Sequence, residues 1–308
     1  MAEKILVAGS TNIDLVLPTP YIPAPGETLI SDGNYVFTPG GKGANTAVAA
    51  VQMGAGVVFC SRVGDDAYGE SLVSLFASRG IDTRFIKTDK TEPTGLAVVT
   101  VERGGTNRII AYPGANAKLC ASDIDAAFES CPDAVLTQFE LNRDAVIAAA
   151  RCAHTDDVPL FVDAGAAEPD FPLDKLLKVE IFSPNEVETE ILTGIRPNNL
   201  NNCLRASIAL CSRVSIRYVV LKLGGRGCYV YDGKYCDLVS PYDVEPVDTT
   251  AAGDAFTAAL TAEYLRTGDI IAAARFANAA GALTVTKKGA IKSLPVREEV
   301  EALMNGNR

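Results

Sequence analysis

Two kinds of hydrophobic pattern alternate along most of the chain. Short runs rich in β-branched and aliphatic residues favour strands, and longer runs that favour helices lie between them. The strand-like runs cover residues 5–9, 57–63, 134–138, 160–162, 181–183 and 218–223. The helix-like runs cover residues 44–53, 70–79, 143–153, 186–192 and 204–211.

This regular order predicts an α/β protein. Strands that alternate with helices favour a central, mostly parallel sheet with helices on both faces, which gives three α/β/α layers. Late in the chain, two Ala-rich runs at about 252–267 and 269–286 predict long, fully buried helices. No linker, low-complexity tract or repeat interrupts the sequence, so we expect a single domain over residues 1–308.

Two segments depart from that order. Residues 15–38 and about 94–113 alternate apolar and polar positions in the manner of strands. Within the second segment, residues 103–106 (RGGT) predict a hairpin turn. The simplest arrangement is one small sheet built from both segments, and the alternative is two solvated hairpins.

The composition is typical of a soluble globular protein. Hydrophobic residues make up 48% of the 308 residues, and charged residues make up 21%. A formal net charge of −10 argues against nucleic acid or an anionic membrane as a partner. No apolar run approaches the ~18 residues of a membrane span, and residues 5–9 form a strand pattern instead of a signal peptide. We therefore expect a cytoplasmic protein.

Cysteine and histidine usage narrows the chemistry. The 8 cysteines include no C-x-x-C pair, which favours reduced thiols over a disulfide framework. His154 is the single histidine, so a Ser-His-Asp triad would depend on that residue alone. A hydrolytic triad or a His-rich metal centre is therefore a poor explanation of this chain.

The most informative motif is VDTTAAGDAF at residues 247–256. Asp248 and Asp254 bracket small residues that cannot shield their backbone N–H groups, and a helix-like run follows directly. We expect Thr249 or Thr250 to cap that helix, whose N-terminus would bind an anion. Asp254 would lie in the first turn beside the anion, as phosphoryl transfer to a hydroxyl requires. The alternative is a capped structural helix with an acidic first turn.

A glycine-rich turn precedes another helix-like run at residues 39–50 (PGGKGANTAVAA). Three glycines in four residues let the backbone approach a ligand closely. The spacing fits neither a Walker A loop nor the dinucleotide fingerprint G-x-G-x-x-G. Lys42 and Asn45 lie three residues apart at the start of the helix, where they could contact a polyol or a phosphate.

Asn12 and Asp14 lie two residues apart, so their side chains point the same way. We place both at the end of the first strand, and ligands bind outside the carboxyl ends of parallel strands. A carboxylate that accepts from two hydroxyls and an amide that both donates and accepts suit a sugar. The alternative is a loop in which one of them forms an Asx turn.

Together these motifs resemble the ribokinase family of ATP-dependent carbohydrate kinases, the pfkB type. Residues 40–50 are similar to the family's N-terminal signature and residues 248–254 to its C-terminal one. Within the family, GGKGAN with Asn12 and Asp14 is most similar to the ribokinases themselves. Ordered matches extend the resemblance over nearly the whole chain, at residues 9–14, 25–28, 94–95, 113–117, 183–186, 286–290 and 293–295.

The resemblance implies a ribokinase-like three-layer fold in which the small sheet is a lid over the sugar and pairs across a homodimer. It implies the reaction of MgATP with D-ribose to give ADP and D-ribose 5-phosphate. Mg²⁺ would accompany ATP, a monovalent cation such as K⁺ would activate the enzyme, and the partners would be the sugar and ATP.

The resemblance also implies roles for individual residues. Asp254 would be the general base, and the N–H groups of Ala251, Ala252 and Gly253 would stabilise charge on the γ-phosphate. The implied sugar contacts are Asn12, Asp14, Gly41, Lys42, Asn45, Glu140 and Asp254. The implied nucleotide contacts are Asn185, Lys222, Gly224, Gly225, Gly227, Gly253 and Asn278. The implied metal positions are Glu188 for Mg²⁺ through water, and Asp248, Thr250, Thr284, Lys287, Gly289 and Ser293 for the monovalent cation.

The sequence departs from the ribokinase pattern at three places. Residues 163–167 (DAGAA) stand where ribokinases usually have an Asn-Pro-Ala-Pro-like stretch. Thr46 stands where Gln is frequent, and Asn278 stands where many relatives have His. The first departure bears on how the nucleotide approaches, and none removes a residue with an implied catalytic role.

Other functions stay open. One is a kinase of the same fold for a ketohexose, deoxyribose or a nucleoside. A nucleoside would need an aromatic slot for its base, for which Tyr35, Phe37 and Tyr112 are the candidates. Another is a non-catalytic sugar-binding protein, which would be expected to lose Asp254 or the glycines, and both are intact.

Overall fold

Aliphatic side chains in the main sheet explain why helices cover both of its faces. In β1 (Lys4–Ala8), Ile5 and Val7 pack into one apolar cluster, whereas Leu6 and Ala8 pack into another. Successive strand residues point to opposite faces, so a strand that is apolar at these four positions needs a layer on each side. The three-layer prediction is confirmed.

The computed structural model describes residues 3–103 and 107–306. Within them, the main sheet has 9 strands in the order β13-β12-β11-β10-β9-β8-β1-β4-β5. Neighbours from β11 to β5 are parallel, and β12 and β13 join antiparallel. The bounds are β4 Gly56–Gly64, β5 Ile86–Asp89, β8 Ala134–Gln138, β9 Leu160–Asp163, β10 Lys178–Ser183, β11 Ser215–Lys222, β12 Cys228–Tyr231 and β13 Cys236–Val239.

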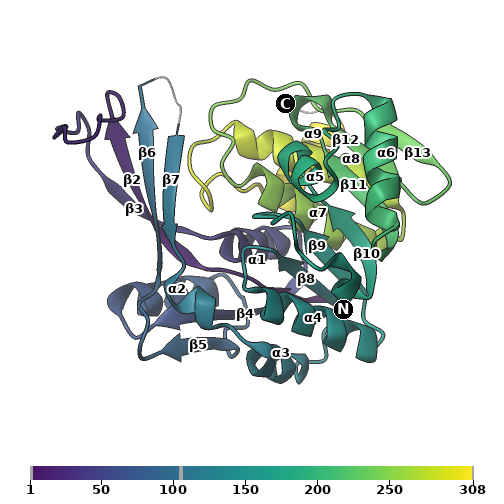
Figure 1. Ribbon diagram of the computed structural model, residues 1–308, viewed down its shortest axis with the longest axis horizontal. Coiled ribbons are helices and arrows are strands. Elements are labelled where there is room, and N and C mark those ends of the chain that lie inside the picture. Colours follow the sequence, from purple (N-terminus) through teal and green to yellow (C-terminus); the bar gives the residue numbers. More distant parts are fainter. Residues whose placement is uncertain (1–2, 104–106, 307–308) are drawn as a thin grey trace.

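The helices divide between the two faces of the sheet (Figure 1). One face carries α1 (Lys42–Gln52), α2 (Ala67–Ser78), α7 (Ala252–Thr267), α8 (Ile270–Val285) and α9 (Arg297–Met304). The other carries α3 (Ala121–Phe128), α4 (Arg143–Thr155), α5 (Glu186–Thr193) and α6 (Leu200–Cys211). The predicted Ala-rich helices α7 and α8 are largely buried, although Arg275 of α8 is exposed. Among the described residues, no helix is long and apolar enough to cross a membrane.

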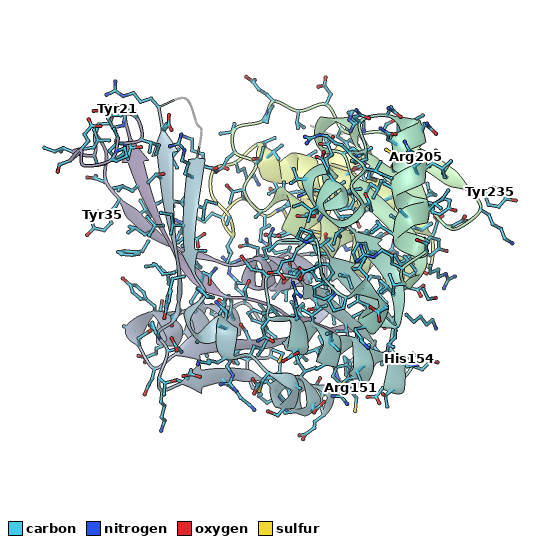
Figure 2. All side chains as sticks on the ribbon, in the orientation of Figure 1. Tyr21, Tyr35, Arg151, His154, Arg205 and Tyr235 are labelled. Atoms are coloured by element: carbon cyan, nitrogen blue, oxygen red, sulfur yellow. The ribbon has the colours of Figure 1, made fainter. Side chains whose placement is uncertain are left out.

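Both inserted segments join one small sheet that projects from the body (Figure 1). Its order is β3-β2-β6-β7, built from β2 (Asn12–Thr19), β3 (Val36–Gly40), β6 (Gly95–Glu102) and β7 (Asn107–Tyr112). Tyr21 and Tyr35 point outward from this part of the molecule (Figure 2). The single-sheet prediction is confirmed, while residues 104–106 of the predicted hairpin turn lie outside the described residues.

The placement of Asn12 and Asp14 at the end of the first strand is wrong. The main-sheet strand β1 stops at Ala8, and both residues begin β2 of the small sheet instead. The reason is pairing, because Asn12 lies opposite Gly40 of β3 and Gly95 of β6. Their side chains still share a face, since two residues separate them along one strand.

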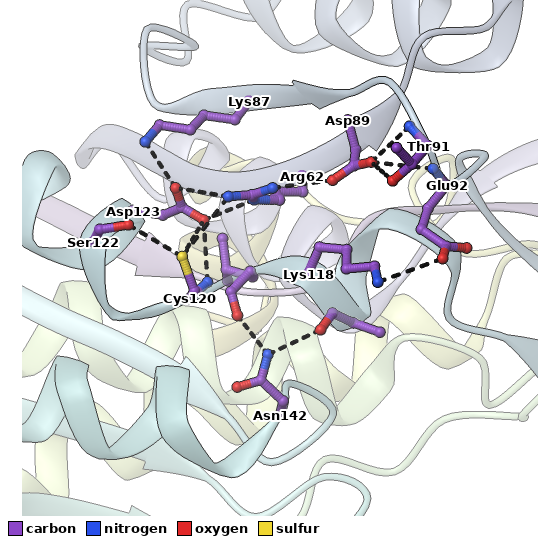
Figure 3. Close-up of polar contacts among 12 residues, drawn as sticks. Arg62, Lys87, Asp89, Thr91, Glu92, Lys118, Cys120, Ser122, Asp123 and Asn142 are labelled. Atoms are coloured by element: carbon purple, nitrogen blue, oxygen red, sulfur yellow. Dashed lines mark hydrogen bonds and ion pairs between the residues drawn. The ribbon is translucent and has the colours of Figure 1, made fainter.

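An ion network around the buried Asp123 carboxylate links β4, β5 and α3 (Figure 3). Arg62 of β4 donates to Asp123 (2.7 Å) and to Asp89 (3.0 Å), and Lys87 pairs with Asp123 at 2.7 Å. Burial opposes ionisation of Asp123, but Arg62 and Lys87 lower its pKa to about 2. Asp89 also accepts the N–H group of Thr91 at 2.9 Å, which fixes the loop that leads into β6.

Candidate active site

The N-terminus of α7 has no side-chain cap. Its N-cap residue is Ala251, whose φ of 62° is left-handed, so the prediction that Thr249 or Thr250 caps the helix is wrong. Thr250 instead donates its hydroxyl to Asp248 at 2.6 Å. In the described part of the chain, the backbone N–H groups of Gly253 and Asp254 have no acceptor. We call residues 251–254 the anion cradle, since bare N–H groups at a helix start attract negative charge.

Asp254 is the buried carboxylate of this cradle. Only 4% of the residue is exposed, and its Oδ2 accepts a hydrogen bond from Asn45 Nδ2 at 2.8 Å. The ammonium of Lys42 lies 3.5 Å from its Oδ1. Burial raises the pKa of Asp254, and the Lys42 charge only partly opposes that rise. A carboxylate with a raised pKa is a better proton acceptor than an ordinary one.

Close backbone contacts position α1 against this carboxylate. A Cβ on Gly43 would lie 2.4 Å from the carbonyl carbon of Gly9, so bare glycine is needed at this contact. Gly41 has a φ of 91°, which glycine adopts without strain. The resulting turn brings Lys42 and Asn45, as predicted from their spacing, to the same helix start.

The polar residues Asn12, Asp14 and Glu140, which the sequence analysis assigned to sugar binding, lie beside α1. Glu140 accepts hydrogen bonds from the Ser10 hydroxyl and from the Lys42 N–H, the latter at 3.1 Å. Burial and the Glu140 charge raise the pKa of Asp14 to about 6. Asn12 accepts from Asn116 Nδ2 at 2.8 Å. The structure therefore gathers the implied sugar contacts from β2, α1 and the end of β8.

Two buried residues to which the sequence analysis gave no role, Asp163 and Thr257, lie beside the cradle. Asp163 Oδ2 accepts hydrogen bonds from the ammonium of Lys222 at 2.6 Å and from the hydroxyl of Thr257 at 2.6 Å. Burial opposes ionisation of Asp163, but Lys222 and Lys42 hold its pKa below the usual value. The signal in the sequence was a carboxylate directly after the buried strand at 160–162.

The start of α5 lies next to the end of β11. Asn185 and Glu188 form a reciprocal capping box, in which Glu188 accepts from the Asn185 N–H at 2.7 Å and from its Nδ2 at 2.8 Å. The backbone N–H group of Lys222 donates a hydrogen bond to the Pro184 carbonyl at 2.9 Å. In the described part of the chain, no three His, Cys, Asp or Glu side chains form a metal-binding group.

The remaining predicted nucleotide positions differ in their surroundings. A Cβ on Gly224 or Gly225 would meet open space, whereas one on Gly227 would lie 2.1 Å from the Val239 carbonyl oxygen. Asn278 donates its Nδ2 to the carbonyls of Val239 and Ser240 at 3.0 Å each. A nucleotide contact from Asn278 would therefore have to use its Oδ1.

Residues of the implied monovalent-cation site meet beside the cradle. Asp248 accepts the N–H groups of Thr250 at 3.0 Å and of Gly289 at 2.9 Å. Lys287 turns its ammonium to Glu299 at 3.0 Å. Ser293 donates its hydroxyl to the Ala290 carbonyl at 2.7 Å.

Comparison with known proteins identifies the family. Residues 2–297 match the pfkB family carbohydrate kinase description. The chain belongs to the pfkB family of carbohydrate kinases. It is therefore an ATP-dependent carbohydrate kinase, as the sequence motifs predicted.

Named relatives of this kinase include ribokinases and deoxyribokinases. It is 36% identical to the ribokinase of Haemophilus influenzae over 302 residues, 97% of each chain. It is 30% identical to the deoxyribokinase of Salmonella typhi over 305 residues, 98% of this chain and 99% of that one. The Arabidopsis thaliana ribokinase complexed with ribose and ATP has a TM-score of 0.88 to this structure, at 31% identity and with 99% of each chain covered.

Proposed function

We propose that this kinase transfers the γ-phosphoryl group of ATP to the 5-hydroxyl of D-ribose. The observation that carries the proposal is Asp254, a buried carboxylate in the first turn of the uncapped helix α7. The ribose oxygen bonds to the γ-phosphorus as the bond to the bridging oxygen of the β-phosphate breaks, and ADP leaves. The hydroxyl proton passes to Asp254. The likeness to the ribokinases of Haemophilus influenzae and Arabidopsis thaliana favours ribose among sugars.

An unpaired buried acceptor supports a hydroxyl-bearing ligand at this place. Asn45 donates to Asp254, but its Oδ1 is buried and has no hydrogen-bond partner within the described residues. Leaving such an acceptor unpaired is costly unless a ligand supplies a donor. A sugar hydroxyl would supply it, while Asp14 and Glu140 would accept from further hydroxyls and Asn12, Gly41 and Lys42 would line the same place.

The register of the small sheet argues against a nucleoside. Asp14 lies opposite Thr38 and beside Ala97, so these residues share one face. Phe37 lies opposite Leu15, one position along, and therefore occupies the other face. Tyr35 packs on Phe37, with ring centroids 5.7 Å apart. Tyr112 pairs with Leu96, which also lies on that second face. None of these three aromatic side chains lies on the face that carries Asp14, the proposed sugar contact.

We place the ATP phosphates at the anion cradle and the rest of the nucleotide along the β11–β12 turn. Lys222, Asn185, Gly224 and Gly225 would line that path, with Gly227 and Asn278 at its far end. Glu188 would hold Mg²⁺ partly through water, and the ion when bound neutralises phosphate charge. Its carboxylate fits this role because Asn185 fixes both of its oxygens at the helix start.

We also propose a monovalent-cation site beside the cradle. Asp248, Thr250, Thr284, Lys287, Gly289 and Ser293 would hold the cation chiefly through backbone carbonyls, which suit K⁺. The fit depends on the lysine ammonium pointing away, as Lys287 does toward Glu299. We expect K⁺ to raise kcat above the values in Na⁺ or a bulky organic cation at equal ionic strength. Equal rates in all three salts would contradict the cation site and leave the role of Asp254 intact.

The small sheet would act as a lid over the sugar and as the surface of a homodimer. Every residue of β7 is exposed, and Ile109 and Ile110 are 59% and 76% exposed. Apolar residues on an unpaired edge strand favour pairing with another copy. Sedimentation analysis of the wild type and of an Ile109→Lys, Ile110→Lys variant tests this proposal, since only the wild type should dimerise.

A substrate panel tests the proposed function. ADP release is measured with ribose, 2-deoxyribose, fructose and a purine nucleoside at equal concentrations. We expect the highest kcat/KM with ribose, and ³¹P NMR should place the phosphate on its 5-oxygen. A higher kcat/KM with deoxyribose or fructose than with ribose would identify that sugar as the preferred substrate and contradict the proposal. Sugar binding without ADP release would identify a non-catalytic sugar-binding protein.

A further inference from the structure

A buried ion pair lies directly beneath the anion cradle. Asp163 ends β9 and Lys222 ends β11, which are the two neighbours of β10 in the sheet. Their side chains are 3% and 11% exposed, and the ammonium lies 2.6 Å from Asp163 Oδ2. The other carboxylate oxygen of Asp163 accepts the Gly165 N–H at 2.9 Å. Both oxygens are thus fixed, and the carboxylate is a rigid anchor for the lysine.

The Lys222 ammonium points at the cradle. A Cβ on Gly253 would have Lys222 Nζ as its nearest neighbour at 3.7 Å. The same nitrogen lies 3.4 Å from the hydroxyl of Thr257, one turn further along α7. An ammonium has three donors. Asp163 and Thr257 account for two of them, and no other hydrogen-bond acceptor among the described residues takes the third, which is available to an oxygen bound at the cradle.

The segment after Asp163 also makes room for the second lysine of the site. A Cβ on Gly165 would lie 2.7 Å from the Cδ and Cε atoms of Lys42. Without that side chain, Lys42 passes the loop and reaches Asp254 at 3.5 Å. Residues 163–165 therefore contact both cations that flank the cradle, and they belong to the stretch in which this sequence departs from the ribokinase pattern.

We propose that Asp163 is a positioning residue for phosphoryl transfer, which holds the Lys222 ammonium against the terminal phosphate of ATP. A lysine side chain is flexible and binds phosphate as a point charge, so an unanchored ammonium would occupy many positions. Asp163 restricts it to the one beside Gly253. This inference rests on the proposed function, because it assigns the ATP phosphates to the cradle.

Three variants test the proposal: Asp163→Asn, Lys222→Gln and the double variant. For each variant, kcat and the KM values for ATP and for ribose are measured. Calorimetry in the absence of sugar gives the affinities for MgADP and for MgAMP-PNP, a non-hydrolysable analogue of MgATP. Lys222→Gln should lower kcat by roughly 10²–10³-fold, the usual effect of removing one charge-stabilising donor. It should weaken AMP-PNP binding more than ADP binding. Asp163→Asn should lower kcat by at least about tenfold, and the double variant should lose no more than Lys222→Gln alone, because Asp163 acts through the lysine.

Glu180→Gln is the matched control. Glu180 has a side chain 11% exposed and pairs with Arg217 at 2.8 Å, near the start of β10 and away from the cradle. It should keep kcat within twofold. Three results would each overturn the proposal. They are an unchanged kcat in Asp163→Asn, equal losses of ADP and AMP-PNP affinity in Lys222→Gln, and a loss of kcat in the double variant that equals the product of the two single losses.

Two safeguards keep the test decisive. If Asp163→Asn does not fold, the double variant, which leaves no buried charge unpaired, carries the comparison of ADP with AMP-PNP. Because that comparison needs no sugar, it separates this inference from the proposed acceptor. The wild-type protein could phosphorylate no sugar while Lys222→Gln still weakens AMP-PNP binding more than ADP binding. That result would refute the proposed function and leave this inference intact.

Discussion

Three carboxylates of the candidate site, those of Asp14, Asp163 and Asp254, differ in what surrounds them. Asp163 has an ammonium at 2.6 Å, and its pKa lies below the usual value. Burial raises the pKa of Asp254, and burial with the Glu140 charge raises that of Asp14. Groups whose environments separate their pKa values can take different roles in one site. Here Asp163 suits a fixed anion, and Asp254 suits a proton acceptor.

Asp14 gives a pH prediction at this scale. Its pKa of about 6 means that it gains a proton as the pH falls from 8 to 5. A hydrogen bond to a charged acceptor contributes about 1.5–3 kcal/mol, but a fraction of Asp14 stays ionised at pH 5, so the KM for ribose should rise by roughly 5- to 10-fold over that range. In Asp14→Asn, the KM should be high at every pH. A wild-type KM that does not change between pH 8 and pH 5 would contradict the assignment.

The same shift predicts the reverse effect on stability. Because the folded pKa of Asp14 is raised, its contribution to stability is present at low pH and is lost as the pH rises through about 6. Asp14→Asn should therefore raise the Tm more at pH 8 than at pH 5, as measured by calorimetry.

The grouping of side chains could be predicted where local motifs carried them. Lys42, Asn45 and Asp254 lie in two short motifs, and the structure brings them together. Asp163 could not be assigned a partner, because Lys222 lies 59 positions away and Thr257 lies 94 positions away. Contacts between strand ends depend on strand order, which one sequence does not encode locally.

At the scale of elements, the N-terminus of α7 is under strain. Ala251 adopts a left-handed φ of 62°, which costs a residue with a Cβ about 1–2 kcal/mol. Within the described residues, the N–H groups of Gly253 and Asp254 then have no acceptor. The threonine-cap prediction was wrong because Thr250 hydrogen-bonds to Asp248 instead.

Ala251→Gly should therefore stabilise the protein. Relief of the left-handed strain exceeds the entropic cost of glycine by about 0.5–1 kcal/mol in the free energy of unfolding. The control is Ala252→Gly, which lies within the helix and should destabilise by a similar amount. Urea denaturation measures both, and a loss of stability in Ala251→Gly would contradict the strain argument.

Element prediction succeeded where the hydrophobic pattern was long. The helices α1, α4, α7 and α8 were all placed within a few residues of their observed bounds. The strands β5 and β13, with 4 residues each, and the helices α3 and α9, with 8 each, were not predicted, because short elements offer few positions for a clear period. The helix α5 also has 8 residues but was predicted, so length is only part of the reason. The start of β2 was misplaced because pairing with β3 and β6, and not local pattern, determines it.

At the scale of the whole molecule, the small sheet and the body both contribute residues to the candidate site. Asn12 and Asp14 belong to the small sheet, whereas Lys42, Asn45 and Asp254 belong to the body. A Cβ on Gly40 would lie 2.2 Å from the Asp14 carboxylate, so the position of this carboxylate depends on glycine at residue 40. A sugar bound by both parts would tie the sheet to the body.

Ribose should therefore slow amide hydrogen exchange in residues 15–38 and 94–113 together. Both segments belong to one sheet, so closure over the sugar protects both. L-Arabinitol, an open-chain polyol, is the control and should leave exchange unchanged. Protection of one segment alone, or of neither, would contradict lid closure.

The central claim is that Asp254 accepts the proton of a sugar hydroxyl as the γ-phosphoryl group arrives. Asp254→Asn keeps the shape and the contact with Asn45 but removes the proton acceptor. Turnover of ATP with ribose by this variant, measured as ADP release beside the wild type, tests the claim most directly. We predict that kcat falls by roughly 10²–10⁴-fold while calorimetry still detects ribose binding. A variant that keeps near-full turnover would contradict the account.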